Sequence, residues 1–242
     1  MIDNNGRDLE LLRLPQFPRS AAYDPGWVVS HQMGPNVLWL TEWLCEVMEL
    51  RPGMRVLDLG CGKALSSIFL AREFDVQVWA TDLWVSASDN WTRIVEQRLT
   101  DWVFPVHADA RNLPFADGFF DAIISVDAFE YFGTDAGFLP TLATHVKSGG
   151  QIGMVNAGVL REVDVLPAEW PSDFAAFHTP EWWRRHWAIS RCVDVDVADH
   201  MEAGRELWLR WNDALGEKND AYVRSAAGKN LGFHRVIARR SN

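Results

Sequence analysis

Two glycines with an acidic residue just before them are the chemically most informative feature of this sequence. The segment Val56-Leu-Asp-Leu-Gly-Cys-Gly62 passes from a continuous apolar run into Gly60 and Gly62. Glycine adopts backbone angles that side chains forbid, and it lets a ligand lie against bare backbone. A helix is expected directly after this turn, and the unpaired N–H groups at its start favour a carboxylate or a phosphate. The pattern therefore predicts a nucleotide-like ligand.

Further acidic residues follow later apolar runs. Asp82 ends the run that begins at Gln77, and Asp109 comes shortly after residues 103–106. A carboxylate at the end of a second strand accepts hydrogen bonds from the two adjacent hydroxyls of a ribose. Charge-assisted bonds of this kind contribute ~1.5–3 kcal/mol each. Asp82 is thus a candidate for ribose recognition.

Strand-like runs alternate with segments of helical period along the chain, which is typical of an α/β protein with a parallel sheet. We predict strands at residues 56–59, 77–81, 103–106, 121–126, 151–156, 192–197 and 233–238. We predict helices at residues 35–50, after the glycine turn with Ile68, Phe69 and Leu70 facing a core, at 86–99 and 135–146, from Thr179 onward, and at 203–215 and 219–227.

A dinucleotide cofactor is one interpretation of the glycine turn. Its fingerprint is Gly-x-Gly-x-x-Gly, and Leu65 stands at the third glycine position. The missing glycine and the pair Asp109-Ala110 argue against a nicotinamide-dependent oxidoreductase.

Four motifs in succession carry a resemblance to a known family. They are Asp58-Leu-Gly-Cys-Gly62, Thr81-Asp82, Asp109-Ala-Arg-Asn-Leu-Pro-Phe115 and Phe120-Asp-Ala-Ile-Ile-Ser125. In order and spacing they resemble the class I S-adenosylmethionine (SAM)-dependent methyltransferases, and most of all the small-molecule enzymes called methyltransferase type 11. The resemblance implies a Rossmann-like, seven-stranded, mostly parallel sheet with helices on both faces and an antiparallel last strand.

The resemblance also implies a set of cofactor-binding residues. In the family, apolar residues after the second strand pack on the adenine, and an acidic residue after the third strand grips its amino group. Carried over by motif, the set is Asp58, Gly60, Cys61, Gly62, Lys63, Asp82, Leu83, Trp84, Asp109, Ala110, Arg111 and Val126. Two departures stand out: Lys63-Ala64 replaces a common Thr-Gly, and Glu130-Tyr131 replaces a frequent His pair.

Candidates for the catalytic residues that serve the methyl acceptor are His31, Glu130 and Tyr131. Glu130 and Tyr131 follow the fourth strand, at the carboxyl edge where open α/β sheets bind ligands. Asp127, at the same edge, is interpreted equally well as a helix-start residue. His178 is a further titratable candidate.

Residues 1–35 are expected to form an N-terminal arm and a candidate lid. In the family that the sequence resembles, the segment before the first strand often covers the cofactor. His31, Gln32 and Gly34 are therefore candidates for contact with the methionine end of SAM or with the acceptor. Residues 36–242 are expected to form the methyltransferase domain, in which 157–178 and 200–232 are predicted insertions that shape the substrate pocket.

Composition narrows the class of partner. The 242 residues are 48% hydrophobic and carry a net charge of −10, which disfavours nucleic acid and anionic membranes because phosphate-binding surfaces are built from Lys and Arg. No apolar run approaches the roughly 20 residues that span a bilayer. Three scattered cysteines suggest neither a zinc site nor a disulfide framework and fit a reducing cytoplasm.

The predicted function is transfer of the SAM methyl group to a small-molecule acceptor by in-line displacement, with S-adenosylhomocysteine (SAH) as product. No metal constellation stands out. Two alternatives stay open: methyl transfer to a lipid, as in cyclopropane synthases, and a SAM-binding module without catalysis.

Overall fold

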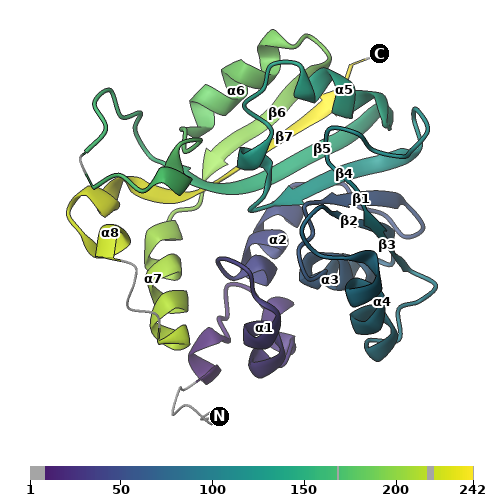
Figure 1. Cartoon of the computed structure of the whole chain (residues 1–242), viewed down its shortest axis with the longest axis horizontal. Helices are drawn as coiled ribbons and strands as arrows, with labels where there is room; N and C mark the ends of the chain where they lie inside the picture. The colour runs from purple at the N-terminus through teal and green to yellow at the C-terminus, as the bar shows by residue number, and fades with distance from the viewer. Residues whose placement is uncertain (1–8, 168, 217–220, 242) are drawn as a thin grey trace.

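The computed structural model describes residues 9–167, 169–216 and 221–241. The strands in these ranges are β1 Arg55–Leu59, β2 Gln77–Asp82, β3 Val103–His107, β4 Phe120–Val126, β5 Val146–Val159, β6 Val193–His200 and β7 Leu231–Arg240. They form a seven-stranded sheet in the order β3-β2-β1-β4-β5-β7-β6 (Figure 1).

Strand direction follows the predicted pattern. β1 pairs in parallel with β2 and β4, and the parallel set continues to β3 on one side and β5 on the other. β7 runs antiparallel to both of its neighbours, β5 and β6. The predicted fold class, a mostly parallel α/β sheet with an antiparallel last strand, is confirmed. The chain reverses its strand order between β1 and β4, which is where open sheets of this kind bind ligands.

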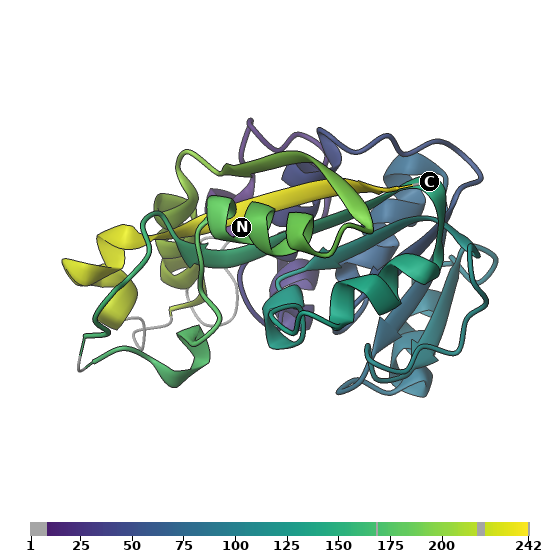
Figure 2. The same ribbon diagram turned by 90° about the horizontal axis from the view of Figure 1, so that it is seen from above.

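Helices cover both faces of the sheet. The α-helices are α1 Pro25–His31, α2 Val37–Cys45, α3 Leu65–Phe74, α4 Ala87–Glu96, α5 Phe138–Thr144, α6 Pro180–Ile189, α7 Gly204–Leu215 and α8 Ala221–Arg224. Short 3₁₀ turns occupy Leu9–Leu12, Ser20–Ala22, Phe129–Tyr131, Ser172–Phe174 and Ala227–Asn230. α2, α3 and α4 lie on one face with α1 and α7, and α5 and α6 lie on the other (Figures 1 and 2).

Two buried clusters result from this layering. Alternate residues of β1 point to opposite faces, so Val56 packs with α2 and α3 whereas Leu57 packs with α5 and α6. Trp183 and Trp187 of α6 are both 0% exposed, as expected for core tryptophans. The burial of both faces explains why the central strands are almost wholly apolar.

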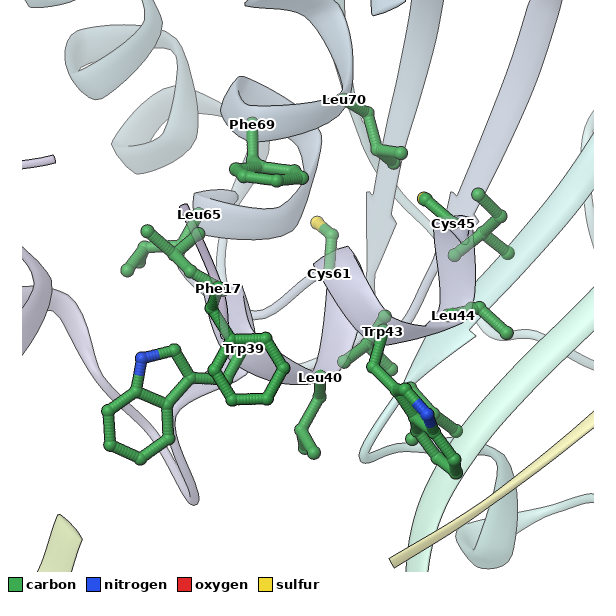
Figure 3. Packing of buried hydrophobic residues seen from close by; sticks show 14 of the residues in the cluster. Phe17, Trp39, Leu40, Trp43, Leu44, Cys45, Cys61, Leu65, Phe69 and Leu70 are labelled. Carbon is green, nitrogen blue, oxygen red and sulfur yellow. The ribbon is translucent and has the colours of Figure 1, made fainter. Parts of the chain in front are cut away.

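The N-terminal segment packs against α2 and α3 on the first face. Figure 3 shows Phe17 beside Trp39 of α2, and the two rings stack with centroids 5.9 Å apart. The described part of the expected N-terminal arm holds two 3₁₀ turns and α1. Residues 1–8 of the predicted arm lie outside the described ranges.

The predicted helix at residues 35–50 is wrong at both ends. α2 begins at Val37, because the side-chain oxygen of Asn36 accepts hydrogen bonds from the backbone N–H groups of Leu38 and Trp39 and caps the helix. The helix ends at Cys45.

Residues 147–150, between the helix predicted at 135–146 and the strand predicted at 151–156, belong to β5. Val146 already pairs with Phe120 of β4, and a register shift is absorbed before Gln151 pairs with Ala122. A bulge of this kind keeps the glycines inside the strand, so the preceding helix, α5, ends at Thr144 rather than at residue 146.

The two predicted insertions differ in content. Residues 157–159 complete β5, and most of the chain from there to residue 178 is irregular. The segment 200–232 contains α7, α8 and the turn Ala227–Asn230. Asn219, the predicted start of the second helix in this segment, lies outside the described residues.

Candidate functional site

A cavity of about 340 Å³ opens at the carboxyl ends of β1, β2, β3 and β4. This volume falls within the roughly 300–1,000 Å³ that small-molecule sites occupy. The predicted site residues that line it are His31, Gly60, Cys61, Gly62, Lys63, Asp82, Leu83, Trp84, Asp109, Ala110, Arg111, Val126 and Tyr131. Asp58 and Glu130 do not line the cavity; they lie buried beside it.

The glycine loop is fixed to the end of β2 by its own backbone. The N–H groups of Gly60 and Cys61 both donate to the carbonyl oxygen of Thr81, at 2.8 and 3.1 Å. Gly60 has φ +75°, and a Cβ at this position would lie 2.4 Å from the Cβ of Ala128. Glycine is therefore required for both the backbone angle and the close approach, and the loop leaves bare backbone facing the cavity.

The next residues turn the chain into α3. Ala64 occupies the helix N-cap with φ +62°, a left-handed conformation that costs a non-glycine residue roughly 1–2 kcal/mol. Burial raises the pKa of the Cys61 thiol well above its ordinary value. A neutral, buried thiol is a poor nucleophile, so Cys61 acts as a small residue that fills a tight turn.

Asp58 supports the loop from below. It is 0% exposed, and one of its oxygens, Oδ2, accepts hydrogen bonds from the hydroxyls of Ser66 and Ser67, both at 2.6 Å. Its other oxygen, Oδ1, has no hydrogen-bond partner among the residues described. Burial raises the pKa of Asp58 to about 6, against the opposing effect of the two serine hydroxyls.

Asp82 organises the region between the glycine loop and α4. One carboxylate oxygen accepts the N–H of Gly62 at 2.8 Å, and the other accepts the N–H groups of Trp84 and Val85 at 2.7 and 2.8 Å. A carboxylate offers about four lone-pair sites. Capacity is therefore left for a ligand hydroxyl at the cavity.

Asp109, just after the end of β3, is a further polar group at the cavity wall, beside the glycine loop and Asp82. The Asp109 carboxylate accepts the backbone N–H of Arg111 at 2.9 Å and lies 3.9 Å from the Arg111 guanidinium. The N–H of Ala108 donates to the carbonyl of Asp82, which ties this strand end to β2. Asp109 and Ala110 thus stand at the cavity wall, where the family resemblance places adenine recognition.

Exposed apolar side chains form the rim of the cavity. Leu83 is 50% exposed and Trp84 is 68% exposed, and the Trp84 ring meets the Tyr131 ring edge-on at 5.2 Å. Burial and nearby carboxylates raise the pKa of Tyr131 to about 12. The phenol therefore stays protonated at neutral pH and is suited to donate a hydrogen bond.

His31 enters the cavity from the end of α1. Its Nδ1 lies 2.8 Å from the carbonyl oxygen of Trp27, which places the proton on Nδ1 and leaves Nε2 as an acceptor. The neighbouring predicted contact, Gln32, is not part of the cavity wall.

Residues 33–37 contribute Met33, Gly34, Pro35 and Val37 to the cavity wall, and of these Met33, Pro35 and Val37 were not predicted. A Cβ at Gly62 would lie 2.9 Å from the sulfur of Met33, so the segment packs directly on the loop. The indole N–H of Trp211 in α7 donates to the carbonyl of Gly34 at 2.9 Å and anchors the segment. The single sequence signal for this arrangement is the Gly34-Pro35 pair, which marks a turn.

Asp127 and Glu130 form a carboxylate pair at the end of β4. Asp127 lines the cavity, and Glu130 is 7% exposed behind it. Burial raises the pKa of Asp127 to about 6, and burial together with the Asp127 charge raises that of Glu130 well above its ordinary value. Asp127 therefore joins the candidate residues, although the sequence offered a helix-start role equally.

His178 lies apart from these groups. Its Nδ1 is 3.1 Å from the Glu162 carboxylate, and its ring stacks on Trp182 at 3.7 Å. Glu162 also accepts hydrogen bonds from Thr179, the N-cap of α6. These contacts fix the end of the 157–178 segment to α6, and His178 is not a wall residue of the cavity.

Two features are absent from residues 9–167, 169–216 and 221–241. No cluster of three or more His, Cys, Asp or Glu side chains in these ranges is placed to hold a metal ion. No helix of the same ranges has the length and apolar character needed to cross a membrane.

The residues present fit a nucleoside cofactor. Bare backbone at Gly60 and Gly62 faces the cavity, and the Thr81 hydroxyl at its wall has no partner in the described part of the chain. Asp82 adds spare acceptor capacity for ligand hydroxyls. Together these groups suit the hydroxyl and amino groups of a nucleoside cofactor and let it lie against the backbone.

Comparisons with known proteins agree with this geometry. Residues 56–150 match the family profile described as "Methyltransferase domain". The chain is 34% identical over 132 residues to a probable fatty acid methyltransferase of Pseudomonas putida, covering 51% of this chain and 32% of the relative. It is 30% identical over 115 residues to phosphoethanolamine N-methyltransferase 1 of Arabidopsis thaliana, covering 46% of this chain and 23% of the relative. The chain thus spans a third or less of the length of these relatives.

A solved structure shows the same fold. Geranyl diphosphate C-methyltransferase from Streptomyces coelicolor A3(2) has a TM-score of 0.67 and 18% sequence identity, covering 83% of this chain and 78% of that chain. The sheet order, the glycine loop and the profile match over residues 56–150 together support a class I SAM-dependent methyltransferase domain of the type 11/25 group, which is the class that the motifs predicted.

Proposed function

We propose that this protein transfers a methyl group from SAM to a small-molecule acceptor held in the cavity. The observation that carries the proposal is a single cavity whose wall includes the glycine loop, Asp82 and Asp109 together with His31, Asp127 and Tyr131. Both reactants need such a shared, partly enclosed space, because methyl transfer requires them in line.

When bound, SAM supplies a methyl carbon that an acceptor lone pair takes as the carbon–sulfur bond breaks, its electrons staying on sulfur to leave SAH. Asp82 would hold the ribose hydroxyls, and Asp109 with Ala110 the adenine edge. The glycine loop would receive the methionine part against its backbone. Residues 33–37 exclude water from above, and positioning of this kind contributes up to ~7–11 kcal/mol of barrier lowering in favourable systems.

The acceptor class cannot be transferred from the relatives, because their names point to fatty acids, phosphoethanolamine and geranyl diphosphate. A local match to cyclopropane-fatty-acyl-phospholipid synthase of Escherichia coli covers 22% of that protein and keeps a lipid acceptor as an outcome of the test.

All three cysteines are free, which suits the reducing cytoplasm proposed for this protein.

The test is an assay with SAM labelled in its methyl group. The protein is incubated with panels of amines, alcohols, thiols, carbon acids and lipid vesicles, and both labelled product and SAH are measured. Acceptor-dependent formation of both in equal amounts is expected. SAM binding without transfer to any class would contradict catalysis and leave a SAM-binding module.

A further inference from the structure

Asp127 is held in an unusual backbone conformation at the cavity wall. Its φ of +52° is left-handed, which only Asn, Asp and a few other non-glycine residues adopt with any frequency. Its N–H donates to the carbonyl of Val155 at 2.7 Å, and the N–H of Ala157 donates to its carboxylate. Contacts with residues near the end of β5 thus hold Asp127 in this strained conformation. Strained backbone that is held by its surroundings is common at ligand sites.

Glu130 stands behind Asp127, and its own backbone N–H donates to its carboxylate. It is only 7% exposed, and its Oε2 has no hydrogen-bond partner in the described ranges. No ion pair within 4.0 Å joins either carboxylate to a Lys, Arg or His side chain of the described residues. A buried carboxyl pair of this kind is unfavourable unless a cation or a proton accompanies it.

Charged groups of both signs lie around the pair, and neither Arg111 nor Lys63 forms an ion pair with it. Asp173, from the 157–178 segment, acts on the Tyr131 phenol together with Glu130 and Asp127. The Arg111 guanidinium donates from Nη2 to the carbonyl oxygen of Tyr131 at 3.4 Å, and its Nη1 lies 3.9 Å from the Asp109 carboxylate. Lys63 lines the cavity from the glycine loop without an ion pair to this group.

The aromatic rim matches the same kind of ligand. Trp84 and Tyr131 present exposed rings at the mouth, and aromatic faces attract cations by about 0.5–1 kcal/mol at exposed sites. The Asp127 carboxylate and the two aromatic rings line the same cavity, and together they suit a positively charged nitrogen.

We propose that the acceptor is an amine, and that Asp127, backed by Glu130, binds its ammonium group and takes a proton from it before methyl transfer. This inference rests on the proposed function and names its substrate class. Burial and the Asp127 charge raise the pKa of Glu130 well above its ordinary value, and burial raises that of Asp127 to about 6, so a proton on the pair resides on Glu130 and Asp127 is the member that carries the charge.

The proton step balances within the pair. An N–H bond of the ammonium breaks, its electron pair stays on nitrogen as the attacking lone pair, and the proton moves to a carboxylate oxygen of Asp127. Glu130 keeps its own proton throughout. The nitrogen regains a positive charge when it acquires the methyl group, and the Asp127 proton is released to solvent before the next cycle.

The experiment measures binding, with turnover as a separate readout. SAH-saturated protein is titrated by calorimetry with a panel of amines, each paired with the alcohol of the same carbon skeleton, including 2-phenylethylamine with 2-phenylethanol. We expect at least one amine to bind roughly ten- to a hundredfold more tightly than its alcohol. Asp127→Asn should abolish that preference, since Asn tolerates the left-handed conformation and removes only the charge.

Two further variants and the cofactor affinities make the test decisive. Asp117→Asn, an exposed charge away from the cavity, is the matched control and should leave the preference intact. Glu130→Gln keeps the shape of the pair and should retain most of the preference, because Glu130 is the protonated member.

Each contrary outcome has a distinct meaning. Alcohols that bind as well as amines, or amines that do not bind at all, would overturn the inference while SAM and SAH binding still support the proposed function. A tenfold loss of SAH affinity in Asp127→Asn would assign Asp127 to the cofactor's own ammonium. A loss of SAM affinity alone would assign it to the sulfonium. Absence of SAM binding would instead refute the proposed function.

Discussion

Asp82 and Glu130 are buried to nearly the same extent, at 8% and 7% exposure, but their surroundings are opposite. Three backbone N–H groups donate to the Asp82 carboxylate, whereas Glu130 retains an oxygen without a partner among described residues. A carboxylate that is already satisfied shapes the backbone around it before any ligand arrives. An unsatisfied one is unfavourable unless a proton or a cation accompanies it. The proposed cofactor contacts at Asp82 are thus preformed, whereas the carboxylate pair proposed for the acceptor is not satisfied by the protein alone.

The largest effect is expected at the glycine loop, for Gly60→Ala. The left-handed backbone adds roughly 1–2 kcal/mol and overlap with Ala128 adds roughly 1–3 kcal/mol to the destabilisation. Gly53→Ala is the matched control, because Gly53 has φ +80° and an added methyl group there would meet no atom within 4 Å. Urea unfolding measures both, and equal losses in the two variants would show that the loop is not tightly packed.

A substitution at Asp58 tests whether burial beneath the glycine loop destabilises the charged form of its carboxyl group. Its pKa is about 6 in the folded protein against an ordinary 3.8, so the folded state binds the proton more readily than the unfolded state. The stability that this provides is complete below about pH 4 and is lost as the pH rises to about 6. Relative to Asp58→Asn, the protein should lose roughly 3 kcal/mol of unfolding free energy between pH 4 and pH 7. Parallel pH profiles for the two proteins would contradict the assignment.

Asp82→Ala should weaken SAM binding by roughly ten- to a hundredfold, from the loss of charge-assisted bonds. The same change frees the N–H of Gly62 and those of Trp84 and Val85, which loosens the loop. Calorimetric titration with SAH measures the affinity. An unchanged value would remove Asp82 from the cofactor site.

The smallest effect on affinity is expected among the residues proposed for the acceptor, for Tyr131→Phe. Its phenol remains protonated at neutral pH, so the change removes one hydrogen-bond donor and no charge. SAM affinity should stay within about twofold while turnover falls by roughly tenfold, the worth of one hydrogen bond. An equal loss in cofactor affinity would place Tyr131 with the cofactor instead.

The same contrast explains what the sequence could predict. The glycine loop, Asp82 and Asp109 come directly after their strands, so short contiguous motifs predict both the fold and the residues proposed for the cofactor. The carboxyl edges of β1, β2 and β3 bring these motifs together because parallel strands share one direction.

The residues proposed for the acceptor could be predicted only in part, because distant segments bring them together. Trp211 of α7 anchors Gly34, and Ala157 of β5 holds Asp127, and neither contact has a local sequence signal. His178 shows that a titratable residue type alone does not predict a place in the cavity. Its side chain contacts Glu162 and Trp182, away from the cavity. The start of α2 was misplaced for a local reason: Asn36 is the N-cap, so the helix begins at Val37 and not at Pro35.

Calorimetric titration of the purified protein with SAM, SAH and NADH tests the central claim most directly. We expect micromolar binding of SAM and SAH and no binding of NADH, because Leu65 stands at the third glycine position of the dinucleotide fingerprint and Asp82 and Asp109 fit an adenosine ligand. Binding of NADH alone would contradict the account and return the glycine loop to a dinucleotide.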